Sequence, residues 1–157
     1  MAEIKRKKTS TKKKLLWAGL IIVVIGAAIY WYVATEKFSD TKDRKSAFTV
    51  SAIDFIREFQ QNDSAANKKY IDKIVTVTGR VSEIEPADTT LNLKFIDSST
   101  GSYAIFAFQQ QHLTEARTVK VGDSVSVKGS CSGGVYSEIL GVESISFKRS
   151  TIDSKIK

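Results

Sequence analysis

The first long apolar segment of the chain, Leu15–Val33, runs for 19 residues without a charged side chain. At about 1.5 Å of rise per residue, a helix of that length spans roughly 28 Å, close to the hydrocarbon thickness of a bilayer. Trp17 lies near its start and Tyr30, Trp31 and Tyr32 near its end, and aromatic rings of this kind favour the membrane interface. The segment therefore predicts a transmembrane helix that serves as an uncleaved signal anchor.

Three other interpretations of this segment fit less well. A cleaved signal peptide has a shorter apolar region and a small-x-small cleavage site, and here Tyr32 stands where a small residue is required. A lipoprotein would need a cysteine just after the apolar run, and Cys131 is the single cysteine of the chain. A fully buried core helix would need more protein around it than the remaining 120 or so residues supply.

Farther along, Val50–Asn62 has apolar residues at helical spacing, with Ser51 or Thr49 available to cap the start. The stripe consists of Ile53, Phe55, Ile56 and Phe59. Such a face could bind a partner, but a surface helix normally buries its apolar stripe on a core. The pattern favours an amphipathic helix packed against a sheet.

From Ile74 onward the apolar residues alternate with polar ones, which is the period of a β-strand. Five strands are predicted, with glycine bends at Gly79 and Gly141, a loop over Gly129–Gly134 and a short helix near Gln110–Glu115. The strands begin near Ile74, Leu91, Tyr103, Val125 and Ile139. An open meander fits this order, but sharply bent short strands favour a small closed barrel of the OB type, which leaves no sheet edge exposed.

The expected fold is therefore all-β with accessory helices: an N-terminal transmembrane helix, then an amphipathic helix and a five-stranded OB-type barrel. The predicted organisation is a basic cytoplasmic tail at 1–14, the transmembrane helix at 15–33, a linker at 34–46, the OB-fold domain at 47–148 and a flexible tail at 149–157.

Two runs of residues resemble a known family. The first contains Phe59, Asn62, Ala66, Lys69-Tyr70, Lys73, Val75, Val77, Thr78 and Gly79, followed by Val81 and Ile84; the second is Val121-Gly122-Asp123-x-Val125-x-Val127-x-Gly129-x-Cys131-x-Gly133. Over about residues 48–147 the chain resembles the tRNA_anti-like OB-fold family of small bacterial domains that are membrane-anchored or exported. The resemblance implies an OB barrel preceded by a helix, a location outside the cytoplasm, and no catalytic residues. Its members often have a second cysteine, which this chain lacks.

The net charge of +7 changes this picture less than its size suggests. Residues 1–14 contain seven basic side chains and one acidic one, so the rest of the chain is almost neutral. A basic flank on the N-terminal side alone keeps that end in the cytoplasm and sends the C-terminal domain across the membrane. A near-neutral domain also makes nucleic acid an improbable partner, because such binding needs a basic groove.

Candidate chemistry is sparse, and the sequence predicts neither an enzyme nor a metal or cofactor site. His112 is the single histidine, with no cluster of ligands or nucleophile beside it, and is expected to be a surface or helix-cap residue. Cys131 is either an exposed thiol that pairs with another chain or a small buried side chain, and burial is favoured. The acids Glu83, Glu85 and Asp88 lack calcium-loop spacing and predict a solvated loop.

The predicted function is a membrane-anchored, extracytoplasmic OB-fold binding module without catalytic activity, whose partner is an envelope protein or another envelope ligand. Single-stranded nucleic-acid binding and a structural subunit that docks on a larger membrane complex remain as alternatives. By analogy with the usual binding face of the fold, the candidate binding residues are Asn92, Lys94, Tyr103, Ser126, Lys128 and Tyr136.

Overall fold

The computed structural model describes residues 11–35, 40–86 and 89–156. The chain divides into two compact units, Met1–Phe38 and Ser39–Lys157. The predicted cytoplasmic tail lies largely outside the described residues, and its last four positions, 11–14, begin the first helix.

Helix α1 (Thr11–Thr35) is the described element of the first unit. Side-chain surroundings are described for residues 17–32 of this helix, and all of them are exposed. Large apolar side chains follow one another along this stretch, for example Ile22 and Val23, each of which is 70% exposed. The stretch therefore has no polar face. A search of the described residues for a helix long and apolar enough to cross a membrane found none. The membrane span predicted at 15–33 therefore stays a prediction.

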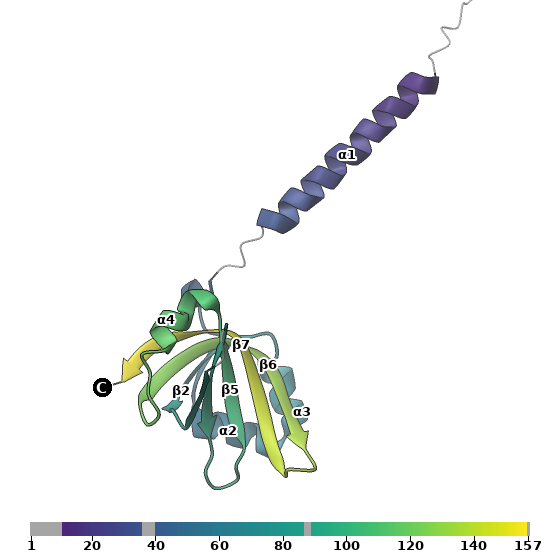
Figure 1. Ribbon diagram of the computed structural model, residues 1–157. Helices are drawn as coiled ribbons and strands as arrows, with labels where there is room; N and C mark the ends of the chain where they lie inside the picture. Colours follow the sequence, from purple (N-terminus) through teal and green to yellow (C-terminus); the bar gives the residue numbers. More distant parts are fainter. Residues whose placement is uncertain (1–10, 36–39, 87–88, 157) are drawn as a thin grey trace, which may run out of the picture. The chain divides into compact units, whose positions relative to one another are not determined.

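The second unit is built mainly of strands (Figure 1). Its strands are β1 (Phe48–Ser51), β2 (Ile74–Arg80), β3 (Glu83–Pro86), β4 (Leu91–Ile96), β5 (Tyr103–Phe108), β6 (Ser124–Ser137) and β7 (Val142–Ile156). Its helices are η1 (Thr41–Asp43), α2 (Ala52–Gln61), α3 (Asp63–Tyr70), η2 (Gln110–His112) and α4 (Leu113–Ala116). Across the described residues, the strands form one sheet in the order β1-β2-β6-β7-β5-β4-β3.

The sheet closes on itself through β2 and β3, which are two halves of one bent strand. β2 pairs with β6 on one side, and β3 pairs with β4 on the other. At the bend, the Val81 amide donates to the Asp123 carbonyl at 2.9 Å, and the next amide, of Ser82, donates to the Lys94 carbonyl at 2.9 Å. β5 runs parallel to β7, whereas β6 and β7 are antiparallel. A closed barrel with one parallel pair is the OB architecture, as the sequence predicted.

Helix α2 contacts β1, β2, β4, β5 and β7, so it covers an end of the barrel (Figure 1). Phe55, Ile56 and Phe59 project from it and are at most 1% exposed. The side chain of Ser51 caps its first turn by accepting from the Asp54 amide at 3.2 Å. The amphipathic helix and the burial of Phe55, Ile56 and Phe59 are confirmed, but Ile53 of the predicted stripe is 37% exposed, and Phe48–Ser51 forms a short strand before the helix begins.

Several predicted boundaries are wrong because the last hairpin is longer than its glycines suggest. Gly129–Gly134 lies within β6, where the predicted loop does not occur. Gly141 lies in the β6–β7 turn at a φ of +67°, a backbone region that favours glycine, and it does not bend a strand. The predicted tail at 149–157 is strand up to Ile156, and within it Thr151 and Ile152 are at most 2% exposed.

Gly79 lies inside β2, and the strand bends two residues later. A Cβ on Gly79 would stand 2.6 Å from the Ala52 Cβ and 3.3 Å from the Phe95 ring. Glycine is therefore required here for the close approach of α2 to the barrel, since any side chain would displace the helix.

The predicted linker at 34–46 also differs from expectation where it is described. Residues 34–35 end α1, and residues 36–39 lie outside the described part. From Asp40 onward the segment packs on the barrel, because Thr41 is buried and the Lys42 ammonium lies 3.1 Å from the Glu115 carboxylate.

Candidate binding site

The usual ligand face of the barrel, the outer side of β4 and β5, is occupied by an internal ion cluster. The pairing of β3 with β4 sets Glu83 opposite Lys94 and Glu85 opposite Asn92. The Lys94 ammonium binds the Glu85 carboxylate and lies 3.4 Å from that of Glu83. It also lies 5.3 Å from the centre of the Tyr103 ring, a cation–π distance.

These contacts mean that Lys94, at the centre of that face, is already paired. The hydrogen bond that Lys94 donates to Glu85 raises the pKa of Lys94 and lowers the pKa of Glu85. Two carboxylates against one ammonium leave the cluster with a net negative charge. A phosphate backbone needs free cations, so the arrangement does not favour nucleic acid on this face.

Two further predicted residues, Ser126 and Lys128 on β6, lie at a second place. Ser126 is buried, and its hydroxyl lies 2.8 Å from that of Thr78. The Lys128 ammonium binds the Asp153 carboxylate at 2.8 Å and donates to the Lys42 carbonyl at 3.3 Å. Both side chains therefore hold strands and the η1 segment together, and they do not present a free surface.

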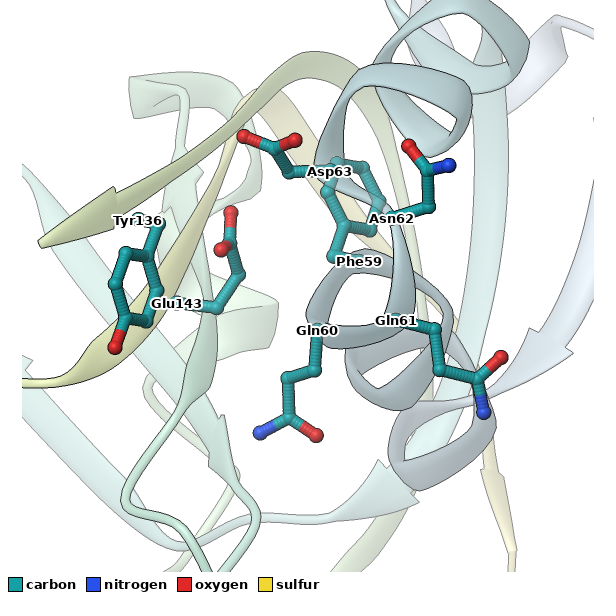
Figure 2. Close-up of a pocket in the computed structure, with 7 residues that line it drawn as sticks. All are labelled: Phe59, Gln60, Gln61, Asn62, Asp63, Tyr136 and Glu143. Carbon is teal, nitrogen blue, oxygen red and sulfur yellow. The ribbon is translucent and has the colours of Figure 1, made fainter.

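Tyr136, the last of the six predicted residues, lies at a third place, near the end of β6, with 52% of its surface exposed. It lines a cavity of about 520 Å³ between the end of α2, the start of α3 and the β6–β7 hairpin (Figure 2). The side chains around this cavity are Phe59, Gln60, Gln61, Asn62, Asp63, Tyr136 and Glu143. We call it the Glu143 pocket.

The Glu143 pocket is shaped by a clamp between α3 and β6. The Asn67 side chain accepts from the Gly134 amide at 2.8 Å and donates to the Gly134 carbonyl at 3.0 Å. The Asn62 side chain accepts from the Ala65 amide at 2.9 Å and so caps α3, which fixes Asp63 in its first turn. These bonds hold the acidic end of α3 at the rim.

Glu143 occupies an inward position of β7 that an apolar residue would normally fill. Glu143, Ile145 and Phe147 alternate along the strand and are at most 3% exposed. The Glu143 carboxylate atom Oε1 is buried, and no hydrogen-bond partner for it is present among the described residues. Burial, helped by the negative charge of Asp63, raises the pKa of Glu143.

Sequence reasoning missed Glu143, although the signal was present. In the segment 142–147 a glutamate shares the phase of Ile145 and Phe147, and a charge within an inward-facing set conflicts with the binary pattern. Such conflicts mark candidate functional positions. The prediction began this strand at Ile139 and treated Gly141 as a bend, so the inward-facing position of Glu143 was not recognised.

His112 and Cys131 contribute to the fold. His112 is buried, so the predicted surface position is wrong, whereas the alternative is confirmed because His112 is the N-cap residue of α4. Its side chain makes no capping hydrogen bond, and its Nε2 atom lies 2.7 Å from an Asp40 carboxylate oxygen, which ties η2 to the segment before η1. Cys131 is fully buried, and burial raises the pKa of its thiol to about 11. The predicted burial of Cys131 is confirmed, and a thiol held protonated in this way is a poor nucleophile.

The acids Glu83 and Glu85 are partners of Lys94, which differs from the solvated loop that the sequence predicted; Asp88 lies outside the described residues. Within the part of the chain that the structure describes, no group of three or more His, Cys, Asp or Glu side chains is arranged to hold a metal ion.

The closed barrel with a parallel β5–β7 pair and a helix over one end defines an OB-fold protein. The family model for tRNA_anti-like proteins matches residues 7–141. The chain therefore belongs to the tRNA_anti-like family, as the resemblance of its motifs indicated.

Among solved structures, the chain is similar to a lipoprotein of Klebsiella pneumoniae subsp. pneumoniae that is described as a candidate nucleic acid-binding protein. The two share 16% identity over 69% of this chain and 91% of that chain, with a TM-score of 0.52. This level of identity supports the fold, and the two chains match over most of the lipoprotein's length.

More distant similarities extend to the Stn1–Ten1 complex of S. pombe and to an aspartyl-tRNA synthetase of Entamoeba histolytica. The first shares 14% identity over 54% of this chain and 58% of that chain, with a TM-score of 0.37. The second shares 11% identity over 57% of this chain and 20% of that chain, with a TM-score of 0.41. A search of curated proteins gave no match.

Proposed function

We propose that this protein is a binding module without catalytic activity, anchored in a membrane by α1, whose OB domain binds an envelope protein or another envelope ligand outside the cytoplasm. The observation that carries the binding role is the Glu143 pocket, which combines a cavity of about 520 Å³ with a buried carboxylate that has an unpartnered oxygen. A folded domain retains such a group at a cost, and a ligand that pairs with it would offset that cost.

Two sequence features support the anchor and its direction. The 19 uncharged residues of 15–33 fall within α1, and the strong basic excess lies on their N-terminal side. A lipid environment suits consecutive exposed side chains such as Leu20, Ile21 and Ile22, because water would otherwise contact all of them.

The location is tested by labelling the full chain in spheroplasts with a membrane-impermeant maleimide. Glu138→Cys places a thiol in the exposed β6–β7 turn, and Ser10→Cys places one in the basic tail, in a Cys131→Ser background. We expect Glu138→Cys to react in intact spheroplasts and Ser10→Cys only after lysis. The opposite pattern would place the domain in the cytoplasm and overturn the proposal.

The anchor is tested in the same cells by extraction of membranes at alkaline pH. The full chain is expected to stay in the pellet, and a chain without residues 15–33 to be released. Replacement of 15–33 by a run of leucines of equal length is the matched control, and it should restore membrane retention. Release of the unaltered chain would show that α1 is not a membrane anchor.

Single-stranded nucleic-acid binding is a second candidate, because the similar Klebsiella lipoprotein is described as a candidate nucleic acid-binding protein. It predicts binding of a labelled oligonucleotide by the full chain that weakens steeply with salt and also occurs in a variant whose basic residues at 1–14 are replaced by glutamine. We expect that variant not to bind, because Lys94 is paired with two glutamates. Retained, salt-sensitive binding would favour this candidate over an envelope ligand.

A further inference from the structure

The lining of the Glu143 pocket has an unbalanced charge. Asp63 and Glu143 contribute two carboxylates, and no lysine, arginine or histidine lines it among the described residues. Figure 2 shows the Glu143 carboxylate on the side of the pocket where that of Asp63 also lies, with the Tyr136 ring beyond Glu143. Elsewhere in the domain, glutamates such as Glu58 and Glu85 have a lysine within hydrogen-bond reach.

Within the pocket, one oxygen of the Glu143 carboxylate is buried without a hydrogen-bond partner among the described residues. This oxygen is Oε1, and Glu143 as a whole is 1% exposed. A buried carboxylate without a partner costs free energy, and the nearby Asp63 adds repulsion. A cation entering this cavity would pair with both acids and remove both costs at once.

The remaining lining groups suit an organic cation. The amide of Gln60 offers a carbonyl oxygen that accepts from N–H donors, and the exposed Tyr136 ring offers an aromatic face. Two carboxylates provide fewer anionic ligands than a tight calcium site uses. The cavity volume of about 520 Å³ admits a long side chain or a small amine.

We propose that the Glu143 pocket binds a cationic nitrogen group, an ammonium or a guanidinium, which pairs with Glu143 and Asp63 beside the Tyr136 ring. The inference rests on the proposed binding function and names the chemistry of its ligand. The cation can belong to a free amine or to a basic side chain of a protein partner, and the recognising contacts are the same in both cases.

The test is calorimetric titration of the purified full-length chain in detergent micelles near neutral pH. Agmatine probes a free cation, and an acetylated Gly-Arg-Gly amide probes a side chain; the same peptide with citrulline has the same shape without the charge. We expect agmatine, the arginine peptide or both to bind, and the citrulline peptide to bind at least about tenfold more weakly, which corresponds to about 1.4 kcal/mol.

Two variants with the same chemical change separate the pocket from the general surface charge. Glu143→Gln keeps the shape of the side chain and removes its charge, and it is expected to weaken binding of the cationic probe at least tenfold. Glu138→Gln alters an exposed glutamate in the neighbouring turn, and its affinity is expected to stay within twofold of the parent. A melting temperature of Glu143→Gln equal to or above that of the parent would verify that the loss of binding does not reflect unfolding.

The outcomes are decisive in both directions. Binding of agmatine alone assigns the site to a free cation, and binding of the arginine peptide alone assigns it to a protein partner. Absence of binding by either cationic probe, equal binding of the citrulline peptide, unchanged affinity in Glu143→Gln, or binding of calcium without binding of the amines would each overturn the proposal. Because the titration does not depend on membrane topology, its failure leaves the labelling result standing, and the reverse also holds.

Discussion

The two acidic clusters of the barrel differ in how their charge is balanced. On the outer face of β3 and β4, Glu83 and Glu85 share Lys94, and all three side chains reach solvent to some extent. In the Glu143 pocket, Asp63 and Glu143 face a cavity that no lysine, arginine or histidine lines within the described part of the chain. The first cluster is complete within the chain, whereas the second lacks a counter-charge that a ligand can supply.

The difference between the two clusters indicates which part of the domain is available to bind a ligand. The usual OB ligand face is the site of the balanced cluster, so its lysine already has partners. The unbalanced cluster lies between the β6–β7 hairpin and the helices α2 and α3, away from that face. We therefore expect binding at the unpaired charge and not at the position typical of the fold.

The largest expected effect comes from Gly134→Ala, which adds a methyl group against Phe59 and Glu143, two of the side chains that line the Glu143 pocket. A Cβ at this position would stand 2.5 Å from the Phe59 ring and 2.7 Å from Glu143 Oε1, so both side chains must move. We expect a loss of about 1–3 kcal/mol in the free energy of unfolding, as is typical of overpacking. Urea denaturation measures it, and Ser132→Ala, at an exposed position of the same strand, serves as the control. An unchanged midpoint for Gly134→Ala would mean that Phe59 and Glu143 are loosely packed against this strand.

A smaller effect is expected from Glu143→Gln, and it depends on pH. The pKa of Glu143 is raised by burial and by Asp63, so the folded state holds its proton more tightly than the unfolded state does. The stability of the parent chain should therefore fall as pH rises from the ordinary glutamate value through the raised one, and the variant should lack this fall. Near neutral pH we expect Glu143→Gln to be the more stable chain, by the order of 1 kcal/mol.

Chemical denaturation at several pH values between 4 and 8 checks this expectation. The ionisable groups that line the pocket with Glu143 are Asp63 from α3 and Tyr136 from β6. Parallel stability curves for the parent and the variant would mean that Glu143 titrates as it does in the unfolded chain.

Much of the barrel could be predicted from the sequence, because alternation and helical spacing reflect burial directly. The β4 segment Leu91–Ile96 and the stripe on α2 were predicted on these grounds. The extent of β6 and β7 was not, because Gly133 and Gly134 are turn residues by composition and lie in a strand for a tertiary reason. Asn67, Ile71 and Phe59 approach so closely there that a side chain would not fit.

The candidate site was predicted less well, since ion pairing depends on which strands become neighbours. Lys94 was proposed as a binding residue from its place on the ligand face, but the pairing of β3 with β4 supplies it with glutamates nine and eleven residues away. Tyr136 was predicted and does line the Glu143 pocket. Asp63 and Glu143 are 80 positions apart in the sequence, and local pattern does not bring such residues together.

On the balanced side of the comparison, Lys94→Met keeps the apolar stem and removes the charge. Glu83 and Glu85 then repel each other without compensation, so we expect a modest loss of stability, smaller than that of Gly134→Ala, which high salt reduces by screening. Urea denaturation at low and high ionic strength measures both the loss of stability and its reduction by salt. Lys148→Met, at an exposed position of β7, is the matched control and should show little change at either ionic strength.

The finest prediction concerns the coupling within the unbalanced cluster. Asp63→Asn removes the negative charge that helps to raise the pKa of Glu143, so that pKa should move down toward the ordinary glutamate value. The carboxyl carbon-13 shift of Glu143, followed by NMR through a pH titration, reports this directly. Overall stability should change by no more than about 0.5 kcal/mol, because loss of a favourable charge in the first turn of α3 opposes the relief of repulsion.

The matched control is Asp54→Asn, which makes the same change at an acid in the first turn of α2. Asp54 is not among the groups that shift the pKa of Glu143, so its replacement should leave the titration of Glu143 unchanged. If Asp63→Asn also leaves it unchanged, the two acids of the pocket do not interact, and the unbalanced cluster reduces to a single buried carboxylate. A shift with Asp63→Asn alone would establish that they act as a pair, which is the arrangement that a cationic ligand requires.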